Sequence, residues 1–363
     1  MEKKNKLDYV DALRGYAILL VIFAHTGQMF PVNYPSYLKS LIDFGPRGVQ
    51  LFFIVSAFTL FLSGEKRFRE DCRPKIAFFI RRFFRIAPLY YLGIMIYSII
   101  NIHTDSVTVG NILRNIFFIH DLYPYYPLVP GGWSISTEML FYLIVPLLFT
   151  YIKNLNSAVW FTMITLAIAV LSKILCDTIS IDIDPQHLKE LNFPYLFPFS
   201  VPVFGIGISF YFVIFKSDYH IKPYLSLIAA VILLFSIIFN SGVLLMYIQT
   251  AAFGLVALAL SKSHIKFIVN NVSTYFGKLS YSMYIIHFIV IDWIEYSGVL
   301  KNIPHHNNRW ILIYFISKLL LSIIITSILA NITYYLIEIP GQNIGRKVVK
   351  LTEVKTKAKM QTL

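Results

Sequence analysis

The chain has 363 residues, of which 57% are hydrophobic and only 14% are charged. A soluble globular protein carries about 25% charged residues, so this composition excludes an ordinary soluble domain and indicates a protein that lies in a lipid bilayer. The formal net charge of +13 would suit a nucleic-acid binder, but the basic residues gather in alternate loops between apolar stretches. We therefore expect membrane lipids, and no nucleic acid, among its partners.

Ten stretches of the chain are long and apolar enough to cross a membrane as helices, which requires about 20 mostly apolar residues each. They predict an all-α polytopic membrane protein with about ten transmembrane helices. The first stretch is too long for a signal peptide and lacks a clear cleavage site, so we expect it to be retained. The ten stretches lie approximately at residues 10–30, 46–64, 84–102, 133–153, 157–176, 195–215, 223–240, 243–261, 279–298 and 310–338.

The distribution of basic residues predicts the orientation of these helices. Of the 32 Lys and Arg residues, 23 fall on the side that holds both termini and 7 fall in the opposite loops. The remaining two, Arg14 and Lys318, lie within the apolar stretches. Because cytoplasmic loops carry the excess of Lys and Arg, both termini should be cytoplasmic, in a multi-pass protein of the inner (cytoplasmic) membrane. We divide the chain into a transmembrane domain, 1–340, and a basic cytoplasmic tail, 341–363, expected to be a mobile strip attracted to anionic lipid.

The first stretch carries two ionisable side chains, Arg14 and His25. They are eleven residues apart, which on a helix is close to three full turns, so both should project from one face about 16 Å apart. A charge in the hydrocarbon costs roughly 2.5 kcal/mol or more and marks a substrate path by default. Snorkelling of Arg14 and a hydrogen-bonded core imidazole at His25 are the structural alternatives, but the two together on one face favour function.

The first stretch also resembles the opening span of the acyltransferase family 3 membrane proteins, in which ten residues separate an arginine from a histidine. Later stretches resemble further motifs of that family in the same order, over about residues 8 to 340. Ala57 departs from the family's usual glycine, and Met139 and Leu140 replace its usual Glu-Gln. The stretches that carry the resemblance are DALRGYAILLVIFAH, RGVQLFFIVSAF, RRFFRIAPLYY, GGWSISTEMLFYL, KLSYSMYIIH and IEIP.

The resemblance implies an enzyme that moves an acyl group, usually acetyl from cytoplasmic acetyl-CoA, to a hydroxyl of a cell-surface glycan or its lipid-linked precursor. It implies no tightly bound cofactor, with acyl-CoA as a donor substrate. The remaining histidines lack partners at metal-ligand spacing, so we expect no metal. An imidazole suits the general base for such a reaction, so His25 is the candidate base or, as an open alternative, a covalent acyl carrier. Arg14, Arg82 and Arg85 are the candidates to hold the CoA phosphates, with topological anchoring as their alternative.

Glu138 is the second candidate catalytic residue. Its carboxylate could orient the imidazole, hold a sugar hydroxyl, pair with an arginine or form a structural bond between helices. Five further residues are expected to bind substrate, with interfacial anchoring or packing as their alternatives: Trp133, Ser134, Ser136, Tyr284 and His287.

Two rival functions fit the same pattern. One keeps the acyl transfer but changes the acceptor to a lipid, an antibiotic or a small metabolite. The other is a transporter or flippase, in which Arg14 and His25 line a path without catalysing. Consumption of acyl-CoA distinguishes an enzyme from a transporter.

Overall fold

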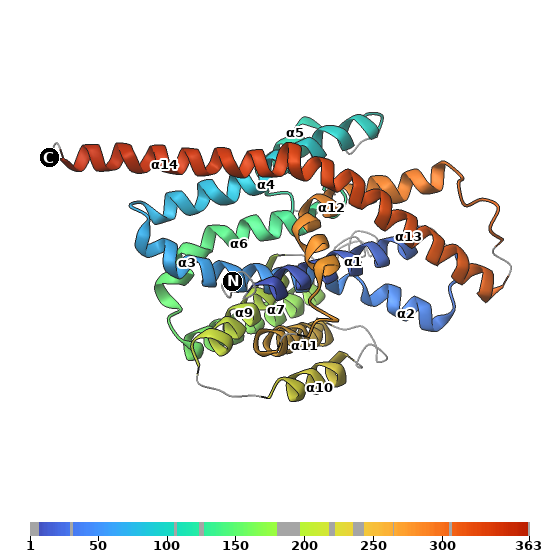
Figure 1. The fold of residues 1–363 in the computed structure, drawn as a ribbon, viewed down its shortest axis with the longest axis horizontal. Helices are drawn as coiled ribbons and strands as arrows, with labels where there is room; N and C mark the ends of the chain where they lie inside the picture. Colours follow the sequence, from blue (N-terminus) through green and yellow to red (C-terminus); the bar gives the residue numbers. More distant parts are fainter. Residues whose placement is uncertain are drawn as a thin grey trace. The chain divides into compact units, whose positions relative to one another are not determined.

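The computed structural model describes residues 7–29, 32–104, 107–122, 127–179, 197–217, 222–234, 243–263, 265–304 and 307–361. Within these ranges every regular element is a helix and no strand occurs (Figure 1). The predicted all-α class is therefore confirmed. In chain order the elements are α1 (Asp8–Gln28), α2 (Ser36–Phe44), α3 (Arg47–Glu70), α4 (Pro74–Ile100), α5 (Val109–Ile116), α6 (Gly132–Tyr151), α7 (Leu155–Ile179), α9 (Phe197–Phe215), α10 (Pro223–Leu234), α11 (Val243–Lys262), α12 (Asn271–Tyr296), α13 (Asn308–Thr333), the π-helix η4 (Tyr334–Glu338) and α14 (Ile339–Gln361).

Eight helical segments in the described part of the chain are long and apolar enough to cross a membrane. Each coincides with one of the predicted stretches. The other two predicted stretches correspond to α10, which has 12 residues and ends where residues 235–242 fall outside the described ranges, and to α12. In α12 the serines, tyrosines and two carboxylates reduce the hydropathy below that of the other long helices. The protein is thus a multi-pass membrane protein, while the orientation of its termini stays a prediction.

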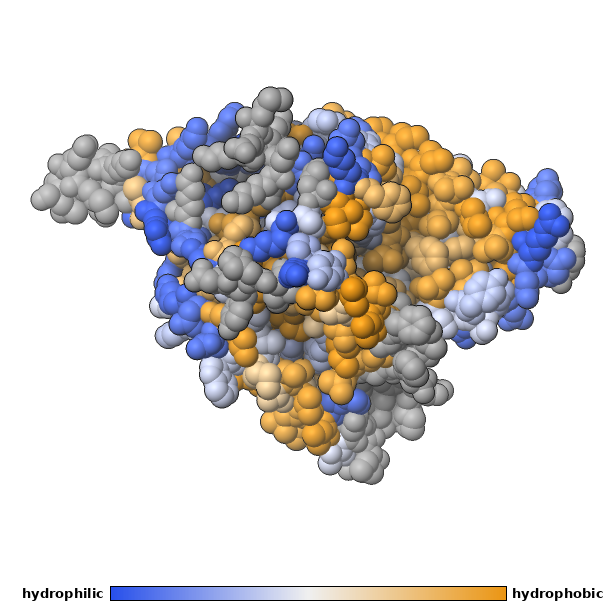
Figure 2. All heavy atoms as spheres, turned by 60° about the horizontal axis from the view of Figure 1, so that its bottom comes forward, coloured by the Kyte–Doolittle hydropathy of each residue, from blue (hydrophilic) through white to orange (hydrophobic). Residues whose placement is uncertain are grey.

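Hydrophobic side chains remain exposed on the outside of the helices. On α7, Trp160 is 68% exposed and Leu171 is 56% exposed. Figure 2 shows broad hydrophobic areas on the face that it presents. A soluble monomer rarely exposes so much contiguous apolar surface, which is the surface that lipid covers.

The chain forms two compact units, and we describe each by itself. Unit 1 comprises Met1–Ser56 and Phe212–Asn331, and unit 2 comprises Ala57–Tyr211 and Ile332–Leu363. The helices α3, α9 and α13 contribute residues to both units, so no loop separates the units in sequence.

In unit 1, α1 packs against α12 through two glycines. A Cβ at Gly15 would lie 2.1 Å from the carbonyl oxygen of Ser273, and a Cβ at Gly277 would lie 1.8 Å from that of Asp11. The two backbones therefore touch where any larger residue would hold them apart, as small residues allow in membrane helices. The start of α12 is held by a capping box between Asn270 and Ser273.

In unit 2, α14 lies beside α4 (Figure 1). Gly341 and Gly345 face Phe84 of α4, again where a Cβ would be crowded. Pro340 cannot donate an amide to the preceding turn, and the π-helical turn η4 ends just before it. The segment after residue 340 is thus helical, and its first turns pack on α4, while its division from the transmembrane domain and its mobility stay predictions. Its contact with lipid stays a prediction.

Candidate active site

The predicted site residues fall into both units of the chain. Unit 1 holds four of them, Arg14, His25, Tyr284 and His287. Unit 2 holds the other six, which are Arg82, Arg85, Trp133, Ser134, Ser136 and Glu138.

The central feature of unit 1 is a direct contact between two imidazoles. Nδ1 of His25, near the end of α1, lies 2.9 Å from Nε2 of His287 in α12. His287 is fully buried, whereas His25 is partly exposed. The close contact between α1 and α12 at Gly15 and Gly277 brings the two helices near enough for this bond.

The hydrogen bonds of His287 determine which nitrogens carry protons. Nδ1 of His287 lies 2.8 Å from the carbonyl oxygen of Tyr284, which can only accept, so this nitrogen carries the hydrogen. A neutral imidazole then has its lone pair on Nε2, and Nε2 accepts from Nδ1–H of His25. The lone pair of His25 is consequently on Nε2. Since charging a buried imidazole without a carboxylate partner is costly, both rings are expected to be neutral.

Aromatic rings surround the imidazole pair. The ring of Phe288 lies 4.4 Å from the His25 ring and 4.2 Å from the His287 ring, between centroids. Tyr284 lies 5.6 Å from His287 and contacts Phe52 of α3 edge-on at 6.1 Å. Tyr284 thus packs beside the pair and supplies it with a backbone carbonyl, while substrate binding by its side chain stays a prediction.

Arg14 lies on the same unbroken helix as His25, as the sequence predicts. Its Nη1 donates to Oδ1 of Asp11 at 3.1 Å, and the side chain of Arg14 is 19% exposed. The Asp11 carboxylate, one turn away, thus partly neutralises the positive charge of Arg14. This pairing has a signal in the sequence, since residues three apart meet on a helix.

In unit 2, Arg82 and Glu138 are linked through a tyrosine. The Arg82 guanidinium lies over the ring of Tyr142 at 5.4 Å and over that of Phe78 at 5.7 Å. The hydroxyl of Tyr142 donates to Oε1 of Glu138, one turn earlier on α6. Of the four alternatives for Glu138, this arrangement favours association with an arginine. Tyr142 is not among the predicted site residues, although its spacing of four residues places it next to Glu138 on a helix.

The serines of the Trp-Ser-x-Ser segment are buried and bonded to backbone. Oγ of Ser134 donates to the carbonyl of Gly131, and Oγ of Ser136 donates to the carbonyl of Phe118 at 2.7 Å. Trp133 is partly exposed at the start of α6. Both hydroxyls stabilise the turn into α6, and a substrate role for all three residues stays a prediction.

The loop before α6 contains a buried polar network that the sequence analysis missed. The hydroxyl of Tyr90 donates to Asn115 at 3.0 Å and lies 3.3 Å from Nε2 of His120. Oγ1 of Thr137 donates to Asp121 at 2.6 Å. Burial lowers the pKa of His120 and raises the pKa of Asp121 to about 7. Asp121 is therefore a carboxyl group that titrates near neutral pH in this loop.

Each unit offers a different chemistry. In unit 1, His25 is partly exposed and its Nε2 has a fixed lone pair, which suits general-base or nucleophilic chemistry. In unit 2 an arginine is aligned by an aromatic ring, in the manner of phosphate-recognising arginines.

Comparison with known proteins places this geometry in context. Residues 7–329 match the family described as "Acyltransferase domain". The chain is 24% identical over 319 residues to "Putative acetyltransferase ORF330" of Acidianus two-tailed virus, which covers 83% of this chain and 88% of that protein.

Two rhizobial proteins match over shorter segments. The exopolysaccharide production protein ExoZ of Rhizobium meliloti (strain 1021) is 30% identical over 106 residues, or 27% of this chain and 32% of ExoZ. Nodulation protein 10 of Rhizobium leguminosarum bv. viciae is 25% identical over 162 residues, or 38% of this chain and 43% of that protein. No solved structure matches the chain.

Proposed function

Because the chain belongs to the acyltransferase family that it matches over residues 7–329, we propose that this membrane enzyme transfers an acetyl group from cytoplasmic acetyl-CoA to a hydroxyl of a cell-surface glycan or of its lipid-linked precursor. The observation that carries the proposal is the hydrogen bond between His25 and His287, which leaves Nε2 of His25 with its lone pair. The enzyme works in the inner membrane, with both termini in the cytoplasm.

In the general-base form of the reaction, Nε2 of His25 takes the proton of the acceptor hydroxyl as its oxygen attacks the thioester carbonyl. The tetrahedral intermediate collapses, the carbon–sulfur bond breaks, and the imidazolium returns the proton to the departing CoA thiolate. An acyl-imidazole on the same nitrogen is the alternative course, in which the acceptor attacks in a second step. Both courses use Nε2, and both need His287 to keep the hydrogen on Nδ1 of His25.

The arginines supply the donor side of the proposal. CoA carries several phosphate charges, and a guanidinium binds phosphate through a planar fork of donors. Arg14, Arg82 and Arg85 lie in those halves of α1 and α4 that the basic loops predict to be cytoplasmic. A CoA held by its phosphates at the cytoplasmic end of either helix would direct its thioester toward the interior of the membrane.

The acceptor is inferred from the relatives. ExoZ is by name an exopolysaccharide production protein, and the viral relative is by name an acetyltransferase. Both names agree with acetyl transfer to a glycan. Histidine, the residue whose ordinary pKa lies nearest neutral pH, suits the activation of such a hydroxyl.

The proposal is tested in a strain that lacks the gene. The surface polysaccharide of this strain should lose O-acetyl groups, and the wild-type gene should restore them. A His25→Ala variant should restore none, whereas a His103→Ala variant, which alters an exposed histidine, should restore them fully. Purified enzyme should release CoA from acetyl-CoA only when an acceptor is present. Full acetylation by a well-expressed His25→Ala protein would show that this imidazole is not the base.

A further inference from the structure

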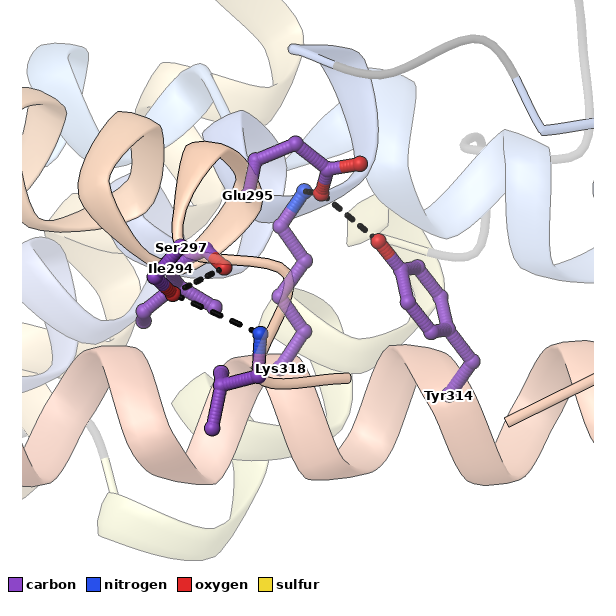
Figure 3. Close-up of polar contacts among 6 residues, drawn as sticks. Ile294, Glu295, Ser297, Tyr314 and Lys318 are labelled. Carbon is purple, nitrogen blue, oxygen red and sulfur yellow. Dashed lines mark hydrogen bonds and ion pairs between the residues drawn. The ribbon is translucent and has the colours of Figure 1, made fainter. Parts of the chain in front are cut away.

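A lysine ammonium is buried in unit 1 away from the imidazole pair. Lys318 of α13 is 0% exposed, and its Nζ donates to Oε2 of Glu295 at 3.0 Å. The hydroxyl of Tyr314 donates to the same oxygen at 2.7 Å. Figure 3 shows the Glu295 carboxylate, at the end of α12, reached by both side chains from α13.

The cluster pairs a buried charge with a partly exposed one. Glu295 is 30% exposed, so its carboxylate can be reached from outside while Lys318 behind it is sealed. A buried lysine without a partner is strongly disfavoured, and Lys318 therefore holds Oε2 in place. In the described part of the chain, the other oxygen of Glu295 has no hydrogen-bond donor. That oxygen can therefore accept a hydrogen bond from a ligand.

Beside this cluster is a buried tyrosine hydroxyl that has no partner in the described part of the chain. The ring of Tyr34 packs edge-on against Phe315 at 5.7 Å, next to Tyr314, and its hydroxyl oxygen is buried without a hydrogen bond in the described residues. Burial and the nearby Glu295 carboxylate raise the pKa of Tyr34 to about 12, so the hydroxyl keeps its proton. What distinguishes this hydroxyl from other buried ones without a partner is its place beside the partly exposed carboxylate of Glu295, where a ligand could accept its hydrogen.

The cluster lies at the end of α12 that follows the imidazole. Glu295 comes eight residues after His287, or about 12 Å farther along the helix axis. Exposed aromatic side chains lie at the same level, with Trp293 55% exposed and Tyr296 87% exposed. Such residues concentrate where a membrane meets water. The cluster therefore lies at the predicted outer interface, about 12 Å along the axis of α12 from His287.

We propose that Glu295, Tyr314 and Tyr34 form the subsite that binds the hydroxyl groups of the acceptor, while His25 activates the hydroxyl that reacts. This inference rests on the function proposed above and deepens it. One acceptor hydroxyl donates to the second oxygen of Glu295, and another accepts from the Tyr34 hydroxyl. Lys318 and Tyr314 position the carboxylate for this contact.

The charges of the cluster select the class of acceptor. Asp292 lies within electrostatic range of Lys318, so the cluster contains two carboxyl groups and one ammonium. A phosphate or another anion would be repelled. A neutral compound with several hydroxyl groups, such as a sugar unit, matches both the acceptor oxygen of Glu295 and the donor of Tyr34.

The test measures acceptor and donor kinetics separately, with the full chain in nanodiscs. The donor is radiolabelled acetyl-CoA, and the acceptor is the glycan fraction, surface and lipid-linked, of a strain lacking the gene. Glu295→Gln should raise the KM for the acceptor by about tenfold or more, the usual effect of weakening a bond to a charged group. Tyr34→Phe should raise it about threefold. The KM for acetyl-CoA should not change in either variant.

Tyr34→Phe is the sharper variant, because it removes no hydrogen bond that the structure shows and should fold like wild type. Ser226→Ala is its matched control, since Ser226 of α10 also has a buried hydroxyl that finds no partner among the described residues. If Tyr34→Phe and Glu295→Gln both keep the wild-type acceptor KM, the subsite is wrong although the enzyme still acetylates glycan. If wild type transfers no acetyl group to the glycan fraction, the proposed function itself is wrong.

Discussion

Nδ1 of His25 and Nε2 of His287 lie 2.9 Å apart, although the two residues are separated by 262 positions in the chain. The backbone carbonyl of Tyr284 holds the far side of the His287 ring at 2.8 Å. A carbonyl, an imidazole and a second imidazole thus form one directed row of hydrogen bonds. The last nitrogen of that row is the one available for chemistry.

The first prediction concerns His287, which acts through His25. His287→Phe should lower kcat by about 10- to 100-fold, as the loss of an orienting partner commonly does, with an unchanged KM for acetyl-CoA. His287→Gln, whose amide oxygen can still accept from Nδ1–H of His25, should recover part of that rate. Initial rates of CoA release measure both. Equal losses in the two variants, with lowered thermal stability, would indicate that His287 only packs.

The second prediction concerns the contact between α1 and α12. Gly277→Ala places a methyl group against the carbonyl of Asp11, so the helices must separate, which should lower the free energy of unfolding by about 3 kcal/mol. It should also displace His287 and reduce activity. Gly110→Ala is the control, since a Cβ there meets nothing within 4 Å. Thermal unfolding in detergent compares the two, and an unaltered midpoint for Gly277→Ala would contradict the close contact.

The third prediction uses the raised pKa of Asp121, about 7 against an ordinary 3.8. The folded protein keeps a proton on this carboxyl that the unfolded chain releases, so stability falls as the pH rises from about 4 to about 7. Three pKa units correspond to about 4 kcal/mol at most. Asp121→Asn should therefore exceed wild type in melting temperature at pH 8 and approach it at pH 4.5. The exposed Asp43→Asn variant should follow wild type at both values, and a constant difference for Asp121→Asn would contradict the shift.

The fourth prediction separates donor binding from anchoring at Arg82. Arg82→Ala should raise the KM for acetyl-CoA by about tenfold, and Arg82→Lys should not restore it, because an ammonium lacks the planar fork. The matched control is Arg69→Ala, whose side chain is 78% exposed and paired with Glu65. Saturation curves with acetyl-CoA measure the effect. A normal KM in a well-expressed Arg82→Ala enzyme would leave this arginine as a topological anchor.

Much of the fold could be predicted from hydropathy, because a membrane helix is a run of apolar residues whose length the bilayer dictates. The predicted stretches agree with the helices wherever a run of apolar residues alone identifies the span. The contact of the segment beyond residue 340 with α4 could not be predicted. Gly341 and Gly345 lie against Phe84, and such a contact with a distant segment leaves no local pattern in the sequence.

Individual residues of the candidate site could be predicted from the sequence, but the contacts between them could not. Spacing on α1 placed Arg14 and His25 on one helix, and the resemblance singled out His287. Neither could show that His287 bonds to His25, because that depends on how α1 and α12 meet. Lys318 and Glu295 were equally hidden. Each looks like an isolated charge in the sequence, and only the structure brings their side chains together.

The ring of Phe288, within 4.4 Å of both imidazole centroids, has a consequence for the fate of the donor. Water is the most abundant nucleophile in the cell, and a thioester beside an activated imidazole would hydrolyse if water could approach freely. An apolar ring against the pair reduces the paths by which water reaches it. On the function proposed above, the same ring should also limit the hydrolysis of acetyl-CoA while no acceptor is present.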